Sequence, residues 1–326
     1  MKISESGLFK ILADGQFHSG QELADSVGVS RTAVWKHLAS LRDKGVELVA
    51  VRGKGYRLDS RVELLETQTI RAHLHSTSAM ILQELNVCYQ LDSTSRVLRD
   101  QLSHSPIHAN VILAEYQKQG RGRGANQWWS APGAGLCLSI GWHFESVPGT
   151  LSALSLATGV VLVECLAAVG RQRIRLKWPN DLVYASAKLG GILIESRGQL
   201  AGAVDVIIGI GINIDMPAGL ASGIAQPVTD LKQVYGFCPS RNLLAGSIIN
   251  GMFDMLHNYT RHGFESYIER WRQLDITRGN MAVLHQPVGN VTGQVVDIDE
   301  NGFLIMSVDG TLSRYSSGDL SLRVLT

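Results

Sequence analysis

The chain has 326 residues, more than one compact core holds at about 100 to 200 residues per domain. It is 45% hydrophobic and 18% charged, with 34 Gly and 8 Pro, and this composition excludes a collagen-like or disordered protein. The net charge is +1, so any nucleic-acid binding must come from a local patch rather than from the charge of the whole molecule.

Neither the start of the chain nor its longest apolar run predicts export or membrane insertion. Residues 1–14 carry four charged side chains and no unbroken apolar stretch, so they do not form the core of a signal peptide. The uncharged run 146–163 is interrupted by Pro and Gly and ends at Glu164, short of the about 20 residues that span a bilayer. It predicts a buried helix instead. The four cysteines form no CxxC pair and have no His at metal-ligand spacing, which predicts reduced thiols of a cytoplasmic protein.

The first 60 residues predict three short helices followed by a hairpin. Leu8, Ile11 and Leu12 share one helical face, and Gly15 ends that helix. The segment Ser19–Glu22 has the composition of a capping box, which opens a second helix.

A turn at Gly28 leads into the third helix, which Ser30 caps. Its apolar positions Val34, Leu38 and Leu41 recur at helical spacing and leave the basic side chains largely on the other face. Two helices joined by a tight Gly turn are typical of the helix-turn-helix arrangement.

Residues 47–51 and 56–58, joined by the basic turn 52–55, predict a hairpin that forms the wing of this arrangement. Residues 30–57 hold seven basic and two acidic side chains, against two basic and four acidic in residues 1–29. This local positive charge favours DNA binding over the alternative of a protein-docking surface. The candidate DNA-binding residues are Ser30, Arg31, Thr32, Trp35, Lys36, Arg52 and Lys54.

From about residue 64 to residue 275, apolar strand-like runs alternate with helical stretches, which predicts an α/β or α+β domain of about 200 residues. The expected strands are 110–114, 135–142, 173–178, 191–195 and 204–214. The expected helices are 151–169, 241–259 and 264–274. The first of these has apolar residues amid Ala and Gly, so we expect it to pack against the sheet on most sides.

After about residue 277 the pattern changes to short strands, expected over 281–284, 291–298, 302–308 and 311–315. Asn301-Gly302 and Asp309-Gly310 mark hairpin turns. About 50 residues of short strands without a helix predict a small barrel, which is marginal alone and is expected to lean on the middle domain.

The stretch 115–124 is the most informative for chemistry. It interleaves Lys118, Arg121 and Arg123 with three glycines, and residues 116–144 contain no acidic side chain. Glycine lets backbone N–H groups approach an anion, and arginine adds bidentate contacts to phosphate or carboxylate oxygens. The pattern is neither a Walker A loop nor a Rossmann fingerprint. It predicts a loop for a charged ligand, with an RNA-binding surface segment as the alternative.

A second cluster, 177–181, has the sequence Lys-Trp-Pro-Asn-Asp, in which the proline forces a change from extended chain to turn. Lys188 stands at the entrance to an apolar strand and either extends toward solvent or faces a ligand anion. Asn213 ends another strand, and Trp128 either stacks on a base or fills core. With no Ser-His-Asp set, these residues predict an anion-handling, nucleotide-using domain joined to a DNA-binding one.

In order and spacing, these strings resemble biotin-protein ligases of the kind that double as biotin operon repressors. The resemblance covers nearly the whole chain and rests on Asp92-Ser93-Thr94, 117–123, 177–181 with Lys188, Gly211-Ile212-Asn213 and 318–323. It implies an α+β multidomain fold. A winged helix-turn-helix DNA-binding domain would span 1–62, a central mixed α/β ligase domain 63–275, and a C-terminal SH3-like β-barrel 276–326.

The resemblance implies an enzyme that uses ATP and Mg²⁺ to form biotinyl-5′-AMP and then transfers biotin to a lysine of the biotin carboxyl carrier protein of acetyl-CoA carboxylase. It also implies a homodimer, formed when the adenylate is bound, that binds operator DNA and represses biotin synthesis genes. Two alternatives stay open. One is a biotin ligase with a non-regulatory winged helix, and the other is a ligand-sensing repressor without ligase activity.

The resemblance also assigns residues. The expected catalytic residues are Arg121, Arg123, Lys188 and Asp181. The expected biotin-binding residues are Ser93, Thr94, Ser95, Gln117, Arg121, Gly122, Arg123 and Lys188. The expected ATP-binding residues are Trp128, Asn180, Asn213 and Arg323, and no metal-ligating residue is expected. Two departures stand out: Ser95 replaces a usual Asn, and Gly124-Ala125-Asn126 replaces a usual Arg-Gly-Arg. We therefore expect the loop to order less firmly over the adenylate.

Overall fold

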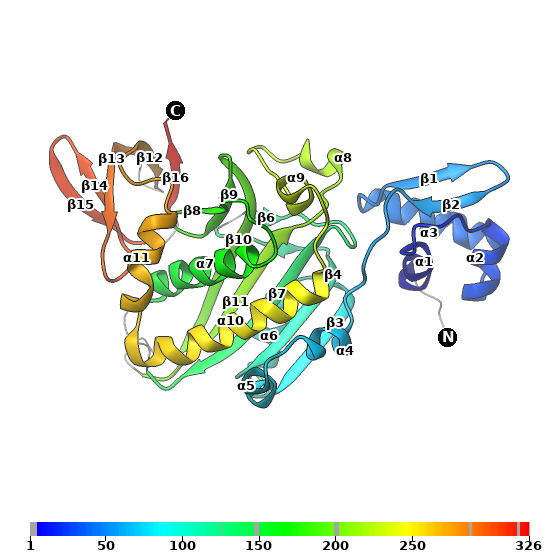
Figure 1. Ribbon diagram of the computed structural model, residues 1–326, viewed down its shortest axis with the longest axis horizontal. Helices are drawn as coiled ribbons and strands as arrows, with labels where there is room; N and C mark the ends of the chain where they lie inside the picture. Colours follow the sequence, from blue (N-terminus) through cyan, green and yellow to red (C-terminus); the bar gives the residue numbers. More distant parts are fainter. Residues whose placement is uncertain are drawn as a thin grey trace.

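The chain forms three parts in sequence order in the computed structural model, which describes residues 5–124, 126–146, 150–198, 202–286, 289–317 and 320–325. Figure 1 shows a small helical part with a two-stranded hairpin at one end, a large sheet with long helices in the middle, and a small sheet at the other end. An extended segment after residue 58 joins the first part to the second. None of the described helices is long and apolar enough to cross a membrane.

The N-terminal part confirms the predicted helices and hairpin. It consists of α1 (Glu5–Leu12), α2 (Gly20–Val27), α3 (Arg31–Asp43), β1 (Leu48–Val51) and β2 (Gly55–Leu58). Ser19 Oγ accepts from the Glu22 amide at 3.0 Å and the Glu22 carboxylate accepts from the Ser19 amide, so the capping box forms. Gly28 ends α2 with a φ of 65°, and Ser30 caps α3. The buried core includes Leu8, Leu12, Leu23, Val34, Leu38, Leu41 and Leu58.

His18 joins the first two helices to the wing. Its ring nitrogens lie 3.1 Å from Asp14 Oδ2 and 2.8 Å from Glu22 Oε1, and its backbone pairs with Tyr56 of β2. Burial by itself lowers the pKa of His18, but the hydrogen bonds and charges of Glu22 and Asp14 outweigh burial and raise this pKa. The charged ring therefore stabilises this arrangement.

We expect the substitution His18→Gln to remove a stabilisation that depends on pH. Because the folded pKa is raised, the stabilisation is fully present below the unfolded value of 6.5 and is lost as pH rises through the folded pKa. The difference in melting temperature between the parent chain and the variant should thus be larger at about pH 5.5 than at about pH 8.5. The same difference at both pH values would contradict this expectation.

A seven-stranded sheet forms the centre of the molecule, in the order β3-β4-β7-β11-β10-β9-β8. The strands are β3 (Glu84–Leu91), β4 (Asn110–Gln117), β7 (Gly135–Phe144), β8 (Arg175–Lys177), β9 (Asp181–Tyr184), β10 (Ala187–Gly198) and β11 (Val204–Asn213). β3 runs parallel to β4, and the other neighbours are antiparallel. All five predicted strands form with shifted bounds. β3 and β9 were not predicted, because the edge strand β3 is only half-buried and lacks an apolar run, and β9 is short.

Helices cover both faces of this sheet. The three long helices were predicted to within three residues: α7 (Leu151–Ala167), α10 (Arg241–His262) and α11 (Glu265–Leu274). They pack on one face, and α7 is buried on most sides, as expected. On the other face, Leu98 of α6 (Thr94–Gln101) packs with Ile107, Ile112 and Ile207. The helices α4 (Thr67–Ala72), α5 (Ser76–Ile81), α6, α8 (Ala218–Ala221) and α9 (Leu231–Tyr235) were not predicted, because such short helices carry few apolar repeats.

The C-terminal part is an antiparallel sheet in the order β15-β14-β13-β12-β16. Its strands are β12 (Met281–His285), β13 (Val291–Ile298), β14 (Leu304–Val308), β15 (Thr311–Tyr315) and β16 (Ser321–Val324), of which β16 was not predicted. Asp309 and Gly310 have φ values of 50° and 80° between β14 and β15, which is the geometry of the expected tight hairpin turn.

The C-terminal sheet shares one hydrophobic core with the central part, as its small size led us to expect. Trp178 Nε1 donates to the Gly302 carbonyl oxygen at 3.1 Å. Gly302 has a φ of 73°, and a Cβ there would lie 2.8 Å from Ala153 Cα in α7. Only glycine therefore fits where this turn meets α7, and the contact holds the sheet beside the 177–181 segment.

Candidate active site and DNA-binding surface

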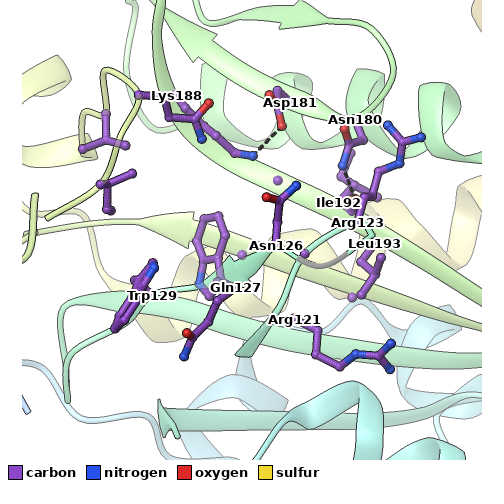
Figure 2. Close-up of a pocket in the computed structure, with 18 of the residues that line it drawn as sticks. Arg121, Arg123, Asn126, Gln127, Trp129, Asn180, Asp181, Lys188, Ile192 and Leu193 are labelled. Carbon is purple, nitrogen blue, oxygen red and sulfur yellow. Dashed lines mark hydrogen bonds and ion pairs between the residues drawn. The ribbon is translucent and has the colours of Figure 1, made fainter. Parts of the chain in front are cut away.

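A pocket of about 580 Å³ opens on the face of the sheet that α6 covers. Its walls come from the start of α6, from the segment after β4, from the 177–181 segment, from β10 and β11, and from the loop 223–228. Figure 2 labels side chains of the segment after β4, of the 177–181 segment and of β10 around the pocket. The pocket thus joins segments that are far apart in the sequence.

Small polar side chains form one end of the pocket. Thr94 donates from its backbone amide to Gln117 Oε1 at 2.8 Å, and its hydroxyl lies 3.1 Å from the same oxygen. Ser139 Oγ lies 2.7 Å from Thr94 Oγ1 and 3.0 Å from Ser95 Oγ. A Cβ at Gly209 would lie 2.7 Å from Ser95 Oγ, so β11 must pass this point without a side chain. This network is buried and linked throughout, and we name it the polar floor.

The glycine and arginine loop forms a hairpin over the pocket. β5 (Gly120–Arg121) pairs with β6 (Gln127–Trp128), and the Gly122 amide donates to the Asn126 carbonyl at 2.8 Å. A Cβ at Gly120 would lie 2.5 Å from the Trp128 carbonyl oxygen, which explains the glycine there. Residue 125, part of the predicted departure from the family pattern, lies outside the described residues.

Trp128 covers the sheet at the glycines of β10 and β11. A Cβ at Gly211 would lie 2.5 Å from the indole, and one at Gly191 would lie 3.5 Å from it. The ring therefore rests on bare backbone with its other face toward the pocket lining. An aromatic face in this position can stack on a planar ligand.

The opposite end of the pocket is cationic. Lys188 Nζ lies 2.6 Å from Asp181 Oδ1, so Lys188 faces the pocket rather than solvent (Figure 2). Lys177 is nearby: burial lowers its pKa most, the charges of Lys188 and Arg323 lower it further, and Asp181 raises it. The Asp181 carboxylate thus lies among several cations, and an anionic ligand would relieve their repulsion.

The predicted asparagines hold loops in place. Asn180 Nδ2 donates to the Ile192 carbonyl at 2.7 Å, and the Ile192 amide donates back to the Asn180 carbonyl. Asn213 Nδ2 donates to the Thr229 carbonyl at 3.0 Å, next to the 223–228 loop. Both residues line the pocket, and their side-chain amide groups bond to backbone carbonyl oxygens.

The two arginines of the hairpin bond away from the cationic end. Arg121 Nη1 lies 2.7 Å from Glu195 Oε1 on β10. Arg123 donates to the carbonyl oxygens of Ser317 and Leu320, at 3.1 Å for Leu320. The hairpin is thus tied to the sheet on one side and to the C-terminal part on the other.

All but one of the residues expected to form the ligand site line this pocket. They are Ser93, Thr94, Ser95, Gln117, Arg121, Gly122, Arg123, Trp128, Asn180, Asp181, Lys188 and Asn213. Arg323 does not line it; it is exposed on β16, close enough to affect Lys177. Gly318 and Asp319 lie outside the described residues.

Sequence reasoning missed Lys177 as a lining residue and Ser139 as the buried hydroxyl that links Thr94 and Ser95. Ser139 was hidden in an apolar strand, where its only signal is a fully buried hydroxyl that needs a partner. Lys177 stood in a motif already singled out, but only the fold shows that it is half-buried near Lys188. The described residues contain no group of three metal-ligating side chains.

The predicted DNA-binding residues lie on one surface of the N-terminal part. Arg31, Thr32, Trp35 and Arg52 line a hollow between α3 and the hairpin, and Trp35 is 62% exposed. Lys36 and Lys54 are exposed beside them, whereas the Ser30 hydroxyl is occupied as the cap of α3. A basic helix beside a basic hairpin, with an exposed aromatic ring, fits the backbone and groove of a duplex.

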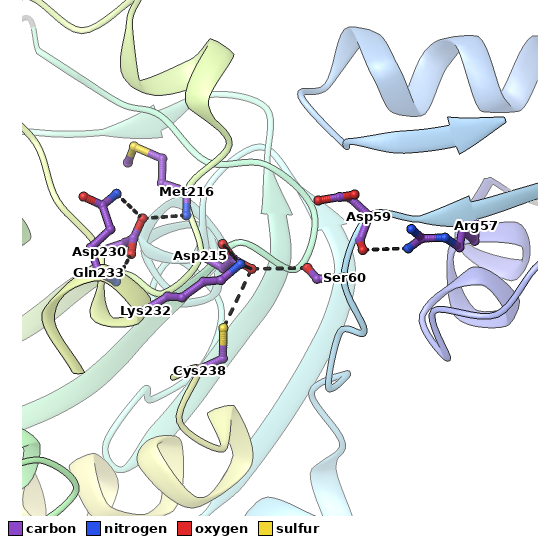
Figure 3. A network of polar contacts seen from close by, with 9 residues as sticks. All are labelled: Arg57, Asp59, Ser60, Asp215, Met216, Asp230, Lys232, Gln233 and Cys238. Carbon is purple, nitrogen blue, oxygen red and sulfur yellow. Dashed lines mark hydrogen bonds and ion pairs between the residues drawn. The ribbon is translucent and has the colours of Figure 1, made fainter. Parts of the chain in front are cut away.

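The segment that joins the two parts touches the pocket side of the central part. Ser60 Oγ donates to Asp215 Oδ2 at 3.3 Å, and Lys232 Nζ lies 2.9 Å from the same oxygen (Figure 3). Asp215 precedes the pocket residue Met216, whose amide donates to Asp230 at 3.1 Å. This network connects the linker to the loop after β11.

Known proteins are similar to this chain over nearly its whole length. Residues 87–213 match the model of the biotin/lipoate A/B protein ligase family, and 7–57 match a helix-turn-helix domain model. The bifunctional ligase/repressor BirA of Salmonella typhimurium is 36% identical over 97% of this chain and 96% of its own length. That of Escherichia coli is 35% identical over the same shares.

Solved structures show the same fold. The chain superposes on the biotin protein ligase of Aquifex aeolicus in complex with biotin and ATP with a TM-score of 0.63 and 23% identity, covering 75% of this chain and all of that one. A mutant of that ligase bound to biotin gives 0.64 and 24% over 74% of this chain and 98% of that one. With relatives this similar over nearly its whole length, the chain belongs to the family of the bifunctional ligase/repressor BirA.

Proposed function

We propose that this chain activates biotin with ATP and Mg²⁺ and transfers the biotinyl group to one lysine of a carboxyl carrier protein. In the first step a carboxylate oxygen of biotin attacks the α-phosphorus, and pyrophosphate leaves. In the second step the lysine amine attacks the acyl carbon of the adenylate, and AMP leaves with the bonding electrons. The observation that carries this proposal is the single pocket with a polar floor at one end and Lys188 and Lys177 at the other.

The polar floor would bind the ureido ring of biotin. Hydroxyl and amide side chains both donate and accept hydrogen bonds. Thr94, Ser95 and Gln117 of the polar floor, together with the neighbouring Ser93, therefore suit a ring that presents both N–H and C=O groups. The backbone of the hairpin, with Gly122 at its turn, would cover the bound ligand. The hairpin begins directly after Gln117 of the polar floor, and a Cβ at Gly120 would lie 3.1 Å from the Gln117 side chain, which supports this orientation.

The cationic end would hold the reacting atoms. Bringing a carboxylate to a phosphate requires charge neutralisation more than a protein nucleophile, which suits a pocket lined by lysines. Lys188 would contact carboxylate and phosphate oxygens and lose its ion pair with Asp181. Asp181 would then accept the proton of the acceptor lysine, since that amine must be neutral to attack.

The nucleotide would lie against Trp128, with Asn180 and Asn213 beside it and Arg323 closing from the C-terminal part. Mg²⁺ usually binds through one or two carboxylates together with substrate phosphates. Asp181 is the one carboxylate among the described residues of the pocket lining, so the site fits an ion that arrives with ATP. The ion would supply further charge neutralisation on the phosphates.

The two arginines of the hairpin have a further proposed role beside the catalytic one that the resemblance implies. Their guanidinium groups bond to Glu195 and to carbonyls of the C-terminal part. We propose that they act by holding the hairpin.

Incubation of the chain with ATP, biotin and a biotin carrier domain tests the ligase function: the carrier should gain the mass of one biotinyl group. No mass change and no pyrophosphate would leave only a ligand-sensing repressor.

The second proposed activity is repression as a dimer. On β10, pairing with β9 ends at Gly191, and Ile192 still bonds to Asn180; in the described part of the chain, residues 193–198 pair as a strand with β11 alone. Such an open edge can pair with a second copy. Two wings related by a two-fold axis would then meet a two-fold symmetric operator.

We expect the double substitution Arg31→Ala, Lys36→Ala to weaken operator binding by about tenfold to a hundredfold without loss of ligation. Both side chains are exposed on α3, far in the chain from the pocket residues. Gel shifts on DNA upstream of biotin synthesis genes, with and without biotin and ATP, measure the effect. If the affinity of the parent chain for this DNA is the same with and without biotin and ATP, the alternative of a non-regulatory winged helix is favoured.

We also propose two finer features of the fold that the sequence predicted: the domain boundaries after residues 62 and 275, and closure of the C-terminal sheet into an SH3-like barrel. The cytoplasmic location that the sequence predicted is proposed as well. The five antiparallel strands and the shared core support the barrel.

A further inference from the structure

The hairpin formed by β5 and β6 needs support from outside itself. Its strands pair over two positions, Gly120 with Trp128 and Arg121 with Gln127. Two-stranded hairpins are marginal in water even when they are longer than this. The position of the hairpin over the pocket therefore depends on the side chains that tie it to the rest of the protein.

One of these ties is a cluster of three charged side chains centred on Glu195. Arg121 Nη1 lies 2.7 Å from Glu195 Oε1, and Arg99 Nη1 lies 3.0 Å from the same oxygen. The Glu195 side chain is 19% exposed, and its other oxygen, Oε2, is buried without a hydrogen-bond partner. The Glu195 carboxylate thus lies between two guanidinium groups, one from the hairpin and one from α6.

The three residues come from the segments that surround the ligand. Arg121 belongs to the hairpin, Glu195 to β10, and Arg99 to α6. Arg99 follows Ser95 of the polar floor by four residues, so the two side chains share one face of α6. Glu195 therefore connects the cover of the pocket to the helix that begins at its floor.

The direction of the Arg121 side chain supports a holding role. In Figure 2 its guanidinium group points away from Lys188 and Asp181, where the reacting atoms would lie. Arg121 thus contributes its backbone to the hairpin wall and its charge to the cluster. On the other side of the hairpin, Arg123 holds the C-terminal part.

We propose that Glu195 is a positioning residue for the ligase reaction, which keeps the hairpin closed over the adenylate through Arg121. This inference rests on the proposed ligase function, because it assumes that the adenylate lies under the hairpin. Removal of the Glu195 charge frees Arg121, the hairpin opens more often, and the intermediate escapes before the acceptor lysine arrives. The effect falls on ligand retention and on KM for biotin more than on kcat.

The test measures release of labelled biotinyl-5′-AMP from preloaded protein. We expect Glu195→Gln and Arg121→Gln each to release it on the order of fivefold faster than the parent chain, the size of effect expected of a half-exposed ion pair. The double variant should release it no faster than either single variant, because both changes remove the same interaction. Glu164→Gln is the matched control. Glu164 does not line the pocket, and its carboxylate lies 2.7 Å from Arg270, the same distance as in the pair of Glu195 with Arg121. It should leave release unchanged.

The outcomes separate the two proposals. If the parent chain forms no adenylate from biotin, ATP and Mg²⁺, the ligase function fails and this inference fails with it. If the parent chain forms adenylate but Glu195→Gln retains it equally long, or if the two single effects add in the double variant, only the inference fails. Melting temperatures measured in parallel report folding. Should Glu195→Gln not fold, Arg121→Gln breaks the same pair from the hairpin side and decides the question.

Discussion

Replacement of Lys188 by methionine is expected to slow biotin-dependent pyrophosphate exchange by about 100-fold to 1,000-fold, the usual effect of removing one preorganised charge from a transition state. Lys188 is partly buried at the cationic end, and its Nζ lies 2.6 Å from Asp181. Methionine keeps most of the volume and removes the charge. It also leaves the Asp181 carboxylate without its ion pair, which adds a negative charge where two anionic substrates must meet.

Two further variants make this result specific. Lys188→Arg keeps the charge but not the compact ammonium group, so it should recover part of the rate. Lys232→Met removes a lysine outside the cationic end, whose Nζ lies 2.9 Å from Asp215 Oδ2. This variant should exchange pyrophosphate at the parent rate. Equal rates for Lys188→Met and the parent chain would show that Lys188 does not act on the reacting atoms.

Replacement of Arg241 by methionine is expected to lower the free energy of unfolding by about 3 to 5 kcal/mol, since it leaves a buried carboxylate without its partner. Arg241 is 3% exposed and Glu115 is 5% exposed, and Arg241 Nη1 lies 2.7 Å from Glu115 Oε2. Arg241 also donates to the carbonyl oxygens of Gly135 and Glu63. It thus joins α10, β4, β7 and the segment that leads to the N-terminal part, all of which lose a contact in the variant.

Urea unfolding followed by fluorescence measures this loss. Arg270→Met is the control, because the Arg270 and Glu164 pair is nearly half exposed and should contribute only about 0 to 1 kcal/mol. The double variant Arg241→Met, Glu115→Leu should recover part of the loss, since it removes the unpaired charge as well. A loss no larger than that of Arg270→Met would mean that the buried carboxylate finds another partner.

The ligand-site residues were predicted better than the contacts that they make. The motifs at 117–123 and 177–181, together with Lys188 and Asn213, were expected near one ligand, and the pocket brings them together. Arg121 and Arg123 were expected to face that ligand; both line the pocket, and their guanidinium groups bond to Glu195 and to the C-terminal part. Residue type and spacing indicate that a charge is needed, but they do not reveal which partner lies within reach of a long side chain.

Local interactions account for what the sequence determined by itself. The capping box at Ser19, the cap at Ser30, the long helices and the turn at Asp309-Gly310 depend on residues within a few positions of one another, so their pattern is visible in the chain. The winged helix-turn-helix and the class of the middle domain follow from such patterns.

Tertiary structure alone decided the rest. Ser139 completes the polar floor because β7 lies between β4 and β11 in a register that places it beside Thr94. Glu195 meets Arg121, 74 positions away in the chain, because β10 passes beneath the hairpin. The edge strand β3 has no apolar run of its own and is held by its pairing with β4. Each of these depends on the pairing of distant strands, whose register no single segment contains.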